Sequence, residues 1–120
     1  MKTLTHTIIS WFLPVLIMVF TACTGTINSV RYMDASGDDT QDGKTPETAW
    51  KSLEKINSEE FGPGATILFK SGEQWSGELK PRGSGNKDNL IRIDKYGEGD
   101  KPVIHGKGGP YTIYLFNQEY

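Results

Sequence analysis

Residues 66–75 read TILFKSGEQW, and this stretch decides the expected fold. A short apolar strand at 66–70 meets the tight turn Ser71-Gly72, and a second strand begins at Trp75. Apolar, β-branched and aromatic residues bounded by Gly and Ser are typical of short strands in an all-β protein. The same alternation continues along the chain. Besides 66–70, strands are expected at 31–33, 75–80, 90–94, 102–105 and 111–116.

The spacing of these strands is nearly constant. Ile67 and Ile91 are 24 residues apart, Ile91 and Ile113 are 22 apart, and Leu79 and Val103 are again 24 apart. Two interleaved series of this kind indicate a solenoid, in which each turn of the chain stacks its strands on the previous turn. A β-sandwich would also give short strands and glycine turns, and it stays open as the alternative.

One amphipathic helix is expected to begin at Thr45 and end near Asn57. Thr45 suits the N-cap position, and Pro46 suits the first helical position. The apolar residues that share one face at helical spacing are Ala49, Trp50, Leu53 and Ile56. A one-sided helix of about three turns would cover an apolar end of the β-structure.

The amino terminus has the pattern of a bacterial export signal. Lys2 precedes an apolar run at 8–20, which is shorter than the ~20 residues that span a bilayer. The single cysteine, Cys23, directly follows the small residues Thr21 and Ala22. This arrangement resembles the lipobox of bacterial lipoproteins, although Phe20 stands where leucine is usual. The resemblance implies cleavage between Ala22 and Cys23 and acylation of Cys23; a plain signal peptide is the alternative.

The expected organisation is a lipoprotein signal peptide at 1–22, a tether at 23–30 and one domain at 31–120. Acyl chains on Cys23 would hold the protein in the membrane of the bacterial envelope. Residues 24–28 contain no acidic cluster, which favours a periplasm-facing anchor in the outer membrane over the cell surface. The formal net charge is −2 and no basic block is present, so nucleic acid is not an expected partner.

Several segments occur in an order and at a spacing that are recognisable together. They read YMDASGDD (32–39), GKTPETAWKSL (43–53), FGPG (61–64), ILFKSGEQW (67–75), YG (96–97) and KPVI (101–104). They resemble the amino-terminal end of secreted right-handed parallel β-helix proteins of the pectate-lyase-like superfamily. The resemblance covers 32–120 and implies a solenoid start with an amino-terminal capping helix.

This superfamily includes polysaccharide lyases, glycoside hydrolases, epimerases and non-catalytic surface proteins, so the fold does not select a reaction. Catalytic residues in its enzymes usually lie several coils further along the chain. We therefore expect a truncated amino-terminal fragment of a polysaccharide-active lyase or hydrolase, inactive by itself and without a catalytic residue. The alternative is a non-catalytic β-helix or small β-rich lipoprotein that binds glycan or acts as a surface scaffold.

The acidic loop at 38–43 matches the first half of a calcium-binding loop. Asp38 and Asp42 occupy its first and fifth positions, and Gly43 occupies the sixth. The twelfth position is Ala49, where the motif needs a glutamate. Weak Ca²⁺ binding through Asp38, Asp39 and Asp42 and a plain Asp-Gly turn both remain open readings of this loop.

Trp75 and Tyr96 are the candidate glycan contacts, because aromatic rings suit the apolar faces of sugars. Core packing is the alternative for both, since a thin solenoid places many aromatic residues inside. His105 lies before Gly106 at a strand end, where a surface position explains it. No two carboxylates have a spacing that fixes the geometry of a hydrolase.

Overall fold

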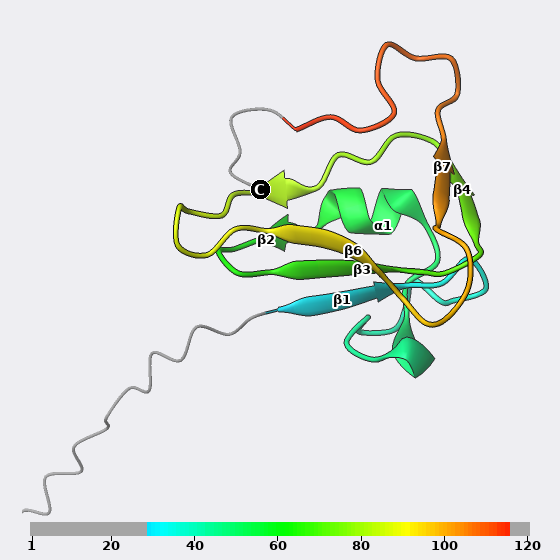
Figure 1. Cartoon of the computed structure of the whole chain (residues 1–120), viewed down its shortest axis with the longest axis horizontal. Coiled ribbons are helices and arrows are strands. Elements are labelled where there is room, and N and C mark those ends of the chain that lie inside the picture. Colours follow the sequence, from blue (N-terminus) through cyan, green and yellow to red (C-terminus); the bar gives the residue numbers. More distant parts are fainter. Residues whose placement is uncertain (1–28, 116–120) are drawn as a thin grey trace, which may run out of the picture.

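The computed structural model describes residues 29–115, and its architecture is mostly β with three small parallel sheets (Figure 1). The elements in chain order are β1 (Val30–Met33), the 3₁₀ helix η1 (Pro46–Thr48), α1 (Leu53–Ser58), β2 (Glu60–Phe61), β3 (Thr66–Lys70), β4 (Gln74–Ser76), β5 (Arg82–Gly83), β6 (Arg92–Tyr96) and β7 (Val103–His105). The expected signal peptide at 1–22 and Cys23 lie outside the described residues. Within 29–115, no helix has the length and apolar character needed to cross a membrane.

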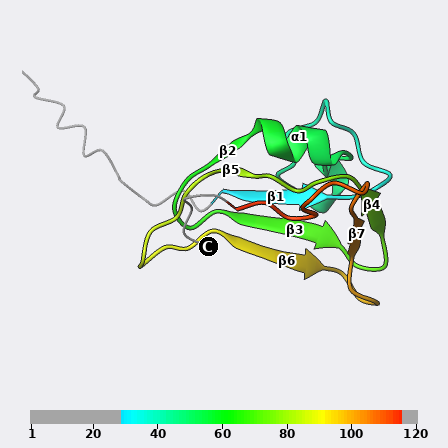
Figure 2. The ribbon, with the colours of Figure 1, turned by 90° about the horizontal axis from the view of Figure 1, so that it is seen from above.

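The strands pair in a regular order. β2, β3 and β4 pair in parallel with β5, β6 and β7 respectively, and β1 joins the other side of β3. Figure 2 shows β1, β3 and β6 side by side. Every ladder between these named strands is parallel, which excludes a sandwich built from hairpins.

The interior of the fold lies between these sheets and α1. In β3, Ile67 and Phe69 are buried while their neighbours are half-exposed, as the two-residue period of a strand requires. The buried cluster consists of Met33, Trp50, Leu53, Ile56, Phe61, Ala65, Ile67, Phe69, Trp75, Leu79 and Ile91. Burying a large apolar side chain contributes about 2 kcal/mol, so this cluster is the main source of stability.

The prediction of a nearly constant interval between stacked residues is wrong. Ile67 pairs with Ile93 and not with Ile91, because β6 begins at Arg92. Leu79 pairs with Ile113 through an isolated bridge and not with Val103. The turns between the sheets differ in length, so the interval between stacked residues differs from one sheet to the next. The expected strand at 111–116 is reduced to that bridge within the described part of the chain.

The expected single helix is two short helices. η1 follows Thr45, whose hydroxyl oxygen accepts a hydrogen bond from the backbone N–H of Thr48 at 3.3 Å. The helix stops at Ala49, where ψ is 145°. α1 then begins after Ser52, whose hydroxyl accepts from the backbone N–H of Lys55 at 3.0 Å. The residues expected on the apolar face are buried as predicted, but the four residues between the helices, 49–52, are not helical.

The break between the helices closes the outer edge of β1. The backbone N–H of Trp50 donates to the carbonyl of Tyr32, and the N–H of Asp34 donates to the carbonyl of Trp50, both at 2.9 Å. The indole N–H of Trp50 also donates to the carbonyl of Gln41 at 2.7 Å. An unpaired edge strand is a site of unwanted association, and the Trp50 segment fills this one.

Gly83 is the position at which backbone geometry most strictly requires glycine. Its φ is +100°, and a Cβ atom there would lie 1.9 Å from the carbonyl oxygen of Phe61. The β2–β5 ladder brings the two backbones this close, because Phe61 faces Gly83 in register.

We predict that Gly83→Ala lowers the free energy of unfolding by about 3 kcal/mol or more, since the strained φ and the backbone clash add. Gly62→Ala is the matched control, because a Cβ atom at Gly62 meets no atom within 4 Å. It should change the free energy by less than about 1 kcal/mol. Urea denaturation of both variants measures this, and equal midpoints would contradict the close approach of β2 and β5.

Candidate functional site

A charged cluster lies where β1, β3 and β6 end, on the outer side of their sheet. The ammonium of Lys70 lies 2.7 Å from Oδ2 of Asp34 and 3.5 Å from Oε1 of Glu73. Tyr96 faces Lys70 across the β3–β6 ladder. Because these strands are parallel, their carboxyl ends meet at one edge and collect these four residues.

Two tyrosines adjoin the charged cluster. The rings of Tyr32 and Tyr96 pack edge to face, with their centroids 5.0 Å apart and an interplanar angle of 87°. The hydroxyl of Tyr96 is buried and has no hydrogen-bond partner among the described residues. Burial, with the nearby charge of Asp34, raises the pKa of Tyr96 to about 12. Tyr96 is therefore neutral at physiological pH and offers an aromatic ring on this face.

The carboxylate of Asp34 is held as an anion. Burial opposes its ionisation, but hydrogen bonds from Lys70 and Ser36 outweigh burial and lower the pKa of Asp34 to about 2. Oδ1 accepts from the N–H of Ser36 at 2.9 Å and from its hydroxyl at 2.7 Å. A hydrolase needs a carboxylic acid with a raised pKa to protonate its leaving group. Asp34 is unsuited to that role.

Glu73 has a structural bond of its own. Its Oε2 accepts a hydrogen bond from the backbone N–H of Ala35 at 2.5 Å, which ties the turn after β3 to the loop after β1. Its other oxygen faces Lys70. Asp34 and Glu73 are thus two carboxylates bound to one ammonium, and neither is free to attack or to protonate a substrate.

The acidic loop uses its carboxylates on the backbone. Asp38 accepts from the N–H of Thr40 at 2.8 Å, and Asp42 accepts from the N–H of Lys44 at 3.0 Å. Hydrogen bonds from the hydroxyl and then the N–H of Thr40 lower the pKa of Asp38, and bonds from the N–H of Lys44 and the hydroxyl of Thr48 lower that of Asp42. Within residues 29–115, no three His, Cys, Asp or Glu side chains gather into a group that could hold a metal. Calcium binding by the loop stays a prediction from its motif.

Asp39 stabilises the break between the two helices. Its Oδ1 accepts from the backbone N–H groups of Lys51 at 2.8 Å and Ser52 at 2.9 Å. Burial opposes ionisation of Asp39, but the bonds from Ser52 and Lys51 outweigh it and lower its pKa. The loop motif predicted Asp39 as a cation ligand. In the structure, the hydrogen bonds of Asp39 join the loop to the start of α1.

The two candidate glycan contacts lie in different environments. Trp75 is 6% exposed, its ring packs edge to face on Phe69, and its indole N–H donates to the carbonyl of Lys51 at 2.9 Å. It is a core residue. Tyr96 is half-buried on the outer face of the sheet, where a sugar ring could approach it.

The sequence did not predict Lys70 and Glu73 as members of the charged cluster, because their contacts with Asp34 depend on the parallel register.

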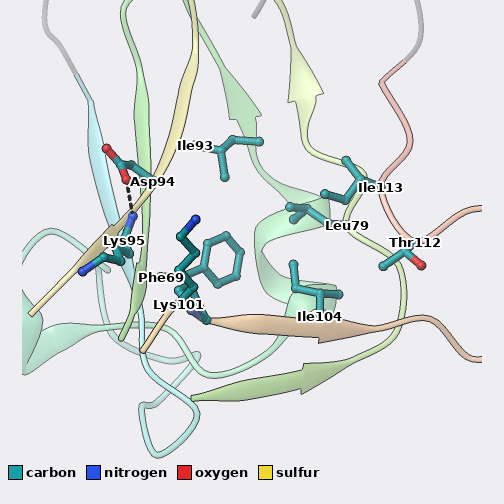
Figure 3. Close-up of a pocket in the computed structure, with 10 residues that line it drawn as sticks. Phe69, Leu79, Ile93, Asp94, Lys95, Lys101, Ile104, Thr112 and Ile113 are labelled. Carbon is teal, nitrogen blue, oxygen red and sulfur yellow. Dashed lines mark hydrogen bonds between the residues drawn. The ribbon is translucent and has the colours of Figure 1, made fainter. Parts of the chain in front are cut away.

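A cavity of about 400 Å³ opens at the end of the interior (Figure 3). Its walls are the inward-facing residues Phe69, Leu79, Ile93, Ile104 and Ile113, which point toward a shared space in Figure 3. Lys95 and Lys101 stand at its rim. Most of the lining is apolar, and the carboxylate of Asp94 lies beside Lys95 and not among the apolar side chains (Figure 3), so the cavity is suited to apolar side chains.

Comparison with known proteins relates part of this chain to lacto-N-biosidases from two bacteria. A lacto-N-biosidase of Bifidobacterium longum subsp. longum is 35% identical in an alignment 96 residues long, which covers 73% of this chain and 6% of that protein. Two crystal structures of GH136 lacto-N-biosidase from Eubacterium ramulus also match. The native protein gives 33% identity and a TM-score of 0.57, and the selenomethionine derivative gives 32% and 0.58.

This chain is homologous to part of a GH136 lacto-N-biosidase. The matched part is small, because the two alignments to the crystal structures cover 61% and 62% of this chain and 12% of the solved chain. No protein-family model matches the sequence. The relation is to part of a bacterial glycoside hydrolase.

The pKa of Asp34 predicts how stability depends on pH. Its folded pKa of about 2 lies below the ordinary pKa of 3.8, so its contribution to stability is complete well above pH ~4 and is lost as the pH falls toward 2. We expect the wild type to lose about 1–2 kcal/mol more than Asp34→Asn over that range. Urea denaturation at several pH values measures it. Asp88→Asn, at an exposed turn, should follow the wild type, and a parallel profile for Asp34→Asn would contradict the ion pair.

Proposed function

We propose that this chain forms the capped start of a right-handed parallel β-helix in a glycan-active glycoside hydrolase. The observation that carries the proposal is the order of strand pairing. β2, β3 and β4 form one turn of chain, and β5, β6 and β7 stack on them in the same order. The homology to GH136 lacto-N-biosidase over this region supports a hydrolase that acts on glycans.

The contribution of this segment is structural. Trp50, Leu53 and Ile56 close one end of the interior, and each is at most 3% exposed. Arg31 and Lys55 lie over the Trp50 ring at 5.4 and 4.8 Å from its centroid, which shields its outer surface. In this proposal the reacting carboxylates come from further turns of the enzyme, since those of Asp34 and Glu73 are bound to Lys70.

The proposed location is the bacterial envelope. The lipobox-like residues around Cys23 support acylation, and the proposal places the anchor in the outer membrane with the domain facing the periplasm. The proposed substrate class is a glycan with a terminal disaccharide of the lacto-N-biose type, by analogy with the relatives' names.

The decisive experiment isolates the native protein from membranes with an antibody against the 31–115 domain. We expect an acylated product longer than 120 residues that hydrolyses a chromogenic lacto-N-bioside, whereas the recombinant 120-residue chain does not. The intact mass also reports acylation, and Cys23→Ala should abolish the acyl mass without affecting hydrolysis. An immunoprecipitate whose single product starts at Cys23, ends at Tyr120 and has no hydrolase activity would overturn the proposal.

A second candidate function is glycan binding without catalysis, and the Tyr32–Tyr96 pair favours it. The pair lies beside the ammonium of Lys70 and the carboxylates of Asp34 and Glu73. In this proposal the aromatic ring contacts the apolar face of a sugar and the polar groups surround it. Lacto-N-biose is the probe, and calorimetric titration of the recombinant chain is the measurement.

In this case Tyr96→Ala should weaken binding by roughly tenfold, equivalent to about 1.4 kcal/mol. Tyr111→Ala, which removes a 52% exposed tyrosine elsewhere on the surface, is the matched control and should bind like the wild type. Equal affinities for the two variants would exclude Tyr96 as the contact.

A further inference from the structure

The outer face of the β1-β3-β6 sheet carries a corner formed by two aromatic rings. Tyr32 lies on β1 and Tyr96 on β6, two strands that are about 10 Å apart because β3 separates them. Their ring centroids are nevertheless only 5.0 Å apart, so the two side chains lean toward each other over β3. The hydroxyl of Tyr96 is buried, so a ligand on this face meets the ring of Tyr96 and not its hydroxyl.

A further turn of chain would leave this corner uncovered. In the proposed β-helix, the next turn pairs with the edge of β6 in the plane of the sheet. Tyr32 and Tyr96 project instead from the face of the sheet, perpendicular to that plane. The two rings are therefore accessible to a ligand in the short chain and in a longer solenoid alike.

An ion pair adjoins the rings on the same face. Asp94 lies two residues before Tyr96 on β6, so both side chains project from one side of the strand. Nη2 of Arg92 lies 2.5 Å from Oδ2 of Asp94, and the two side chains are 71% and 41% exposed. Figure 3 shows the carboxylate of Asp94 directed away from the apolar side chains of the interior. The backbone N–H of Lys95, and then the guanidinium of Arg92, lower the pKa of Asp94, which is therefore an anion at neutral pH.

We propose that Arg92 and Asp94 complete a sugar-contact subsite at the Tyr32–Tyr96 corner, and that the charge of Asp94 makes this subsite reject acidic sugars. The inference rests on the second candidate function above, glycan binding by the tyrosine pair, and adds the residues that select the class of sugar. The ring of Tyr96 stacks on the apolar face of a pyranose. The guanidinium of Arg92 donates hydrogen bonds to the sugar hydroxyls, and the carboxylate of Asp94 accepts them.

The charges beside the rings favour an uncharged ligand. Three carboxylates and two cations are paired there, with a net charge of −1: Asp34, Glu73 and Asp94 with Lys70 and Arg92. Lys95 does not change this balance, because it alternates to the other side of β6 and stands at the rim of the apolar cavity. A uronate would have to displace a carboxylate from its cation against this net charge. Sugar hydroxyls can bind without breaking an ion pair.

A comparison of two disaccharides tests the selection. Calorimetric titration of the recombinant 120-residue chain uses lacto-N-biose as the neutral probe and digalacturonate, which has two carboxylates, as the acidic probe. The wild type should bind lacto-N-biose roughly tenfold more tightly or better, because the site repels the carboxylates.

Asp94→Asn removes the charge, keeps one acceptor oxygen and releases the guanidinium of Arg92 for a carboxylate of the ligand. It should lower the ratio of the two dissociation constants roughly threefold or more, mainly because digalacturonate binds more tightly. Circular dichroism checks that the variant is folded. An unchanged ratio would exclude Asp94 as the selecting residue.

Asp88→Asn is the matched control, because it makes the same change at an exposed turn before β6 and should leave the ratio unchanged. A wild type that binds lacto-N-biose through Tyr96 and binds digalacturonate equally well would overturn the charge selection alone. The candidate function of glycan binding would then stand. A wild type that binds neither disaccharide would overturn both.

Discussion

The rest of the structure depends on the parallel register between β3 and its two neighbours. This register places Ile67 against Ile93 on the inner side and Lys70 beside Tyr96 on the outer side. Because side chains alternate along a strand, a slip of one residue would turn the whole apolar row toward solvent. The hydrophobic interior, the charged cluster and the Tyr32–Tyr96 pair are therefore three consequences of one alignment.

The amino-terminal side of this alignment is closed by backbone pairing more than by helix packing. Trp50 leaves the helical conformation to form hydrogen bonds with β1, and Asp39 binds the N–H groups that follow it. The helix is interrupted at Trp50, and the backbone groups at the edge of β1 are hydrogen-bonded as a result. At the other end of the described residues, the apolar cavity borders β6 through Ile93.

The charged cluster indicates what its own residues can do, and the homology indicates the class of protein to which this segment is related. The Asp34–Lys70–Glu73 cluster is a set of paired charges that joins the loop after β1 to the end of β3 and the turn after it, and the low pKa of Asp34 does not suit acid catalysis. The relatives are glycoside hydrolases of which this chain covers 6% and 12%. These facts agree if this region supports a hydrolase whose reacting groups lie elsewhere, which is the function proposed for it.

Local patterns in the sequence were sufficient to predict the elements that depend on neighbouring residues. The strand at 66–70, the cap at Thr45 and the burial of Trp50, Leu53 and Ile56 follow from alternation, capping chemistry and helical spacing, and the structure confirms them. Tyr96 was recognisable as an aromatic residue, but the sequence placed it after the strand expected at 90–94, whereas it is the last residue of β6. The export signal and Cys23 are sequence patterns that lie outside the described residues.

The tertiary structure alone decided the register, the break in the helix and the composition of the cluster. Trp50 becomes extended because β1 offers unpaired backbone groups, and no nearby residue signals that. Ile67 meets Ile93, and Asp34 meets Lys70, because turns of different lengths bring distant segments together. The sequence by itself determined which residues are apolar, which can turn and which can form short strands. Which of them meet depended on backbone hydrogen bonds between segments far apart in the chain, and these form only when the whole interior packs.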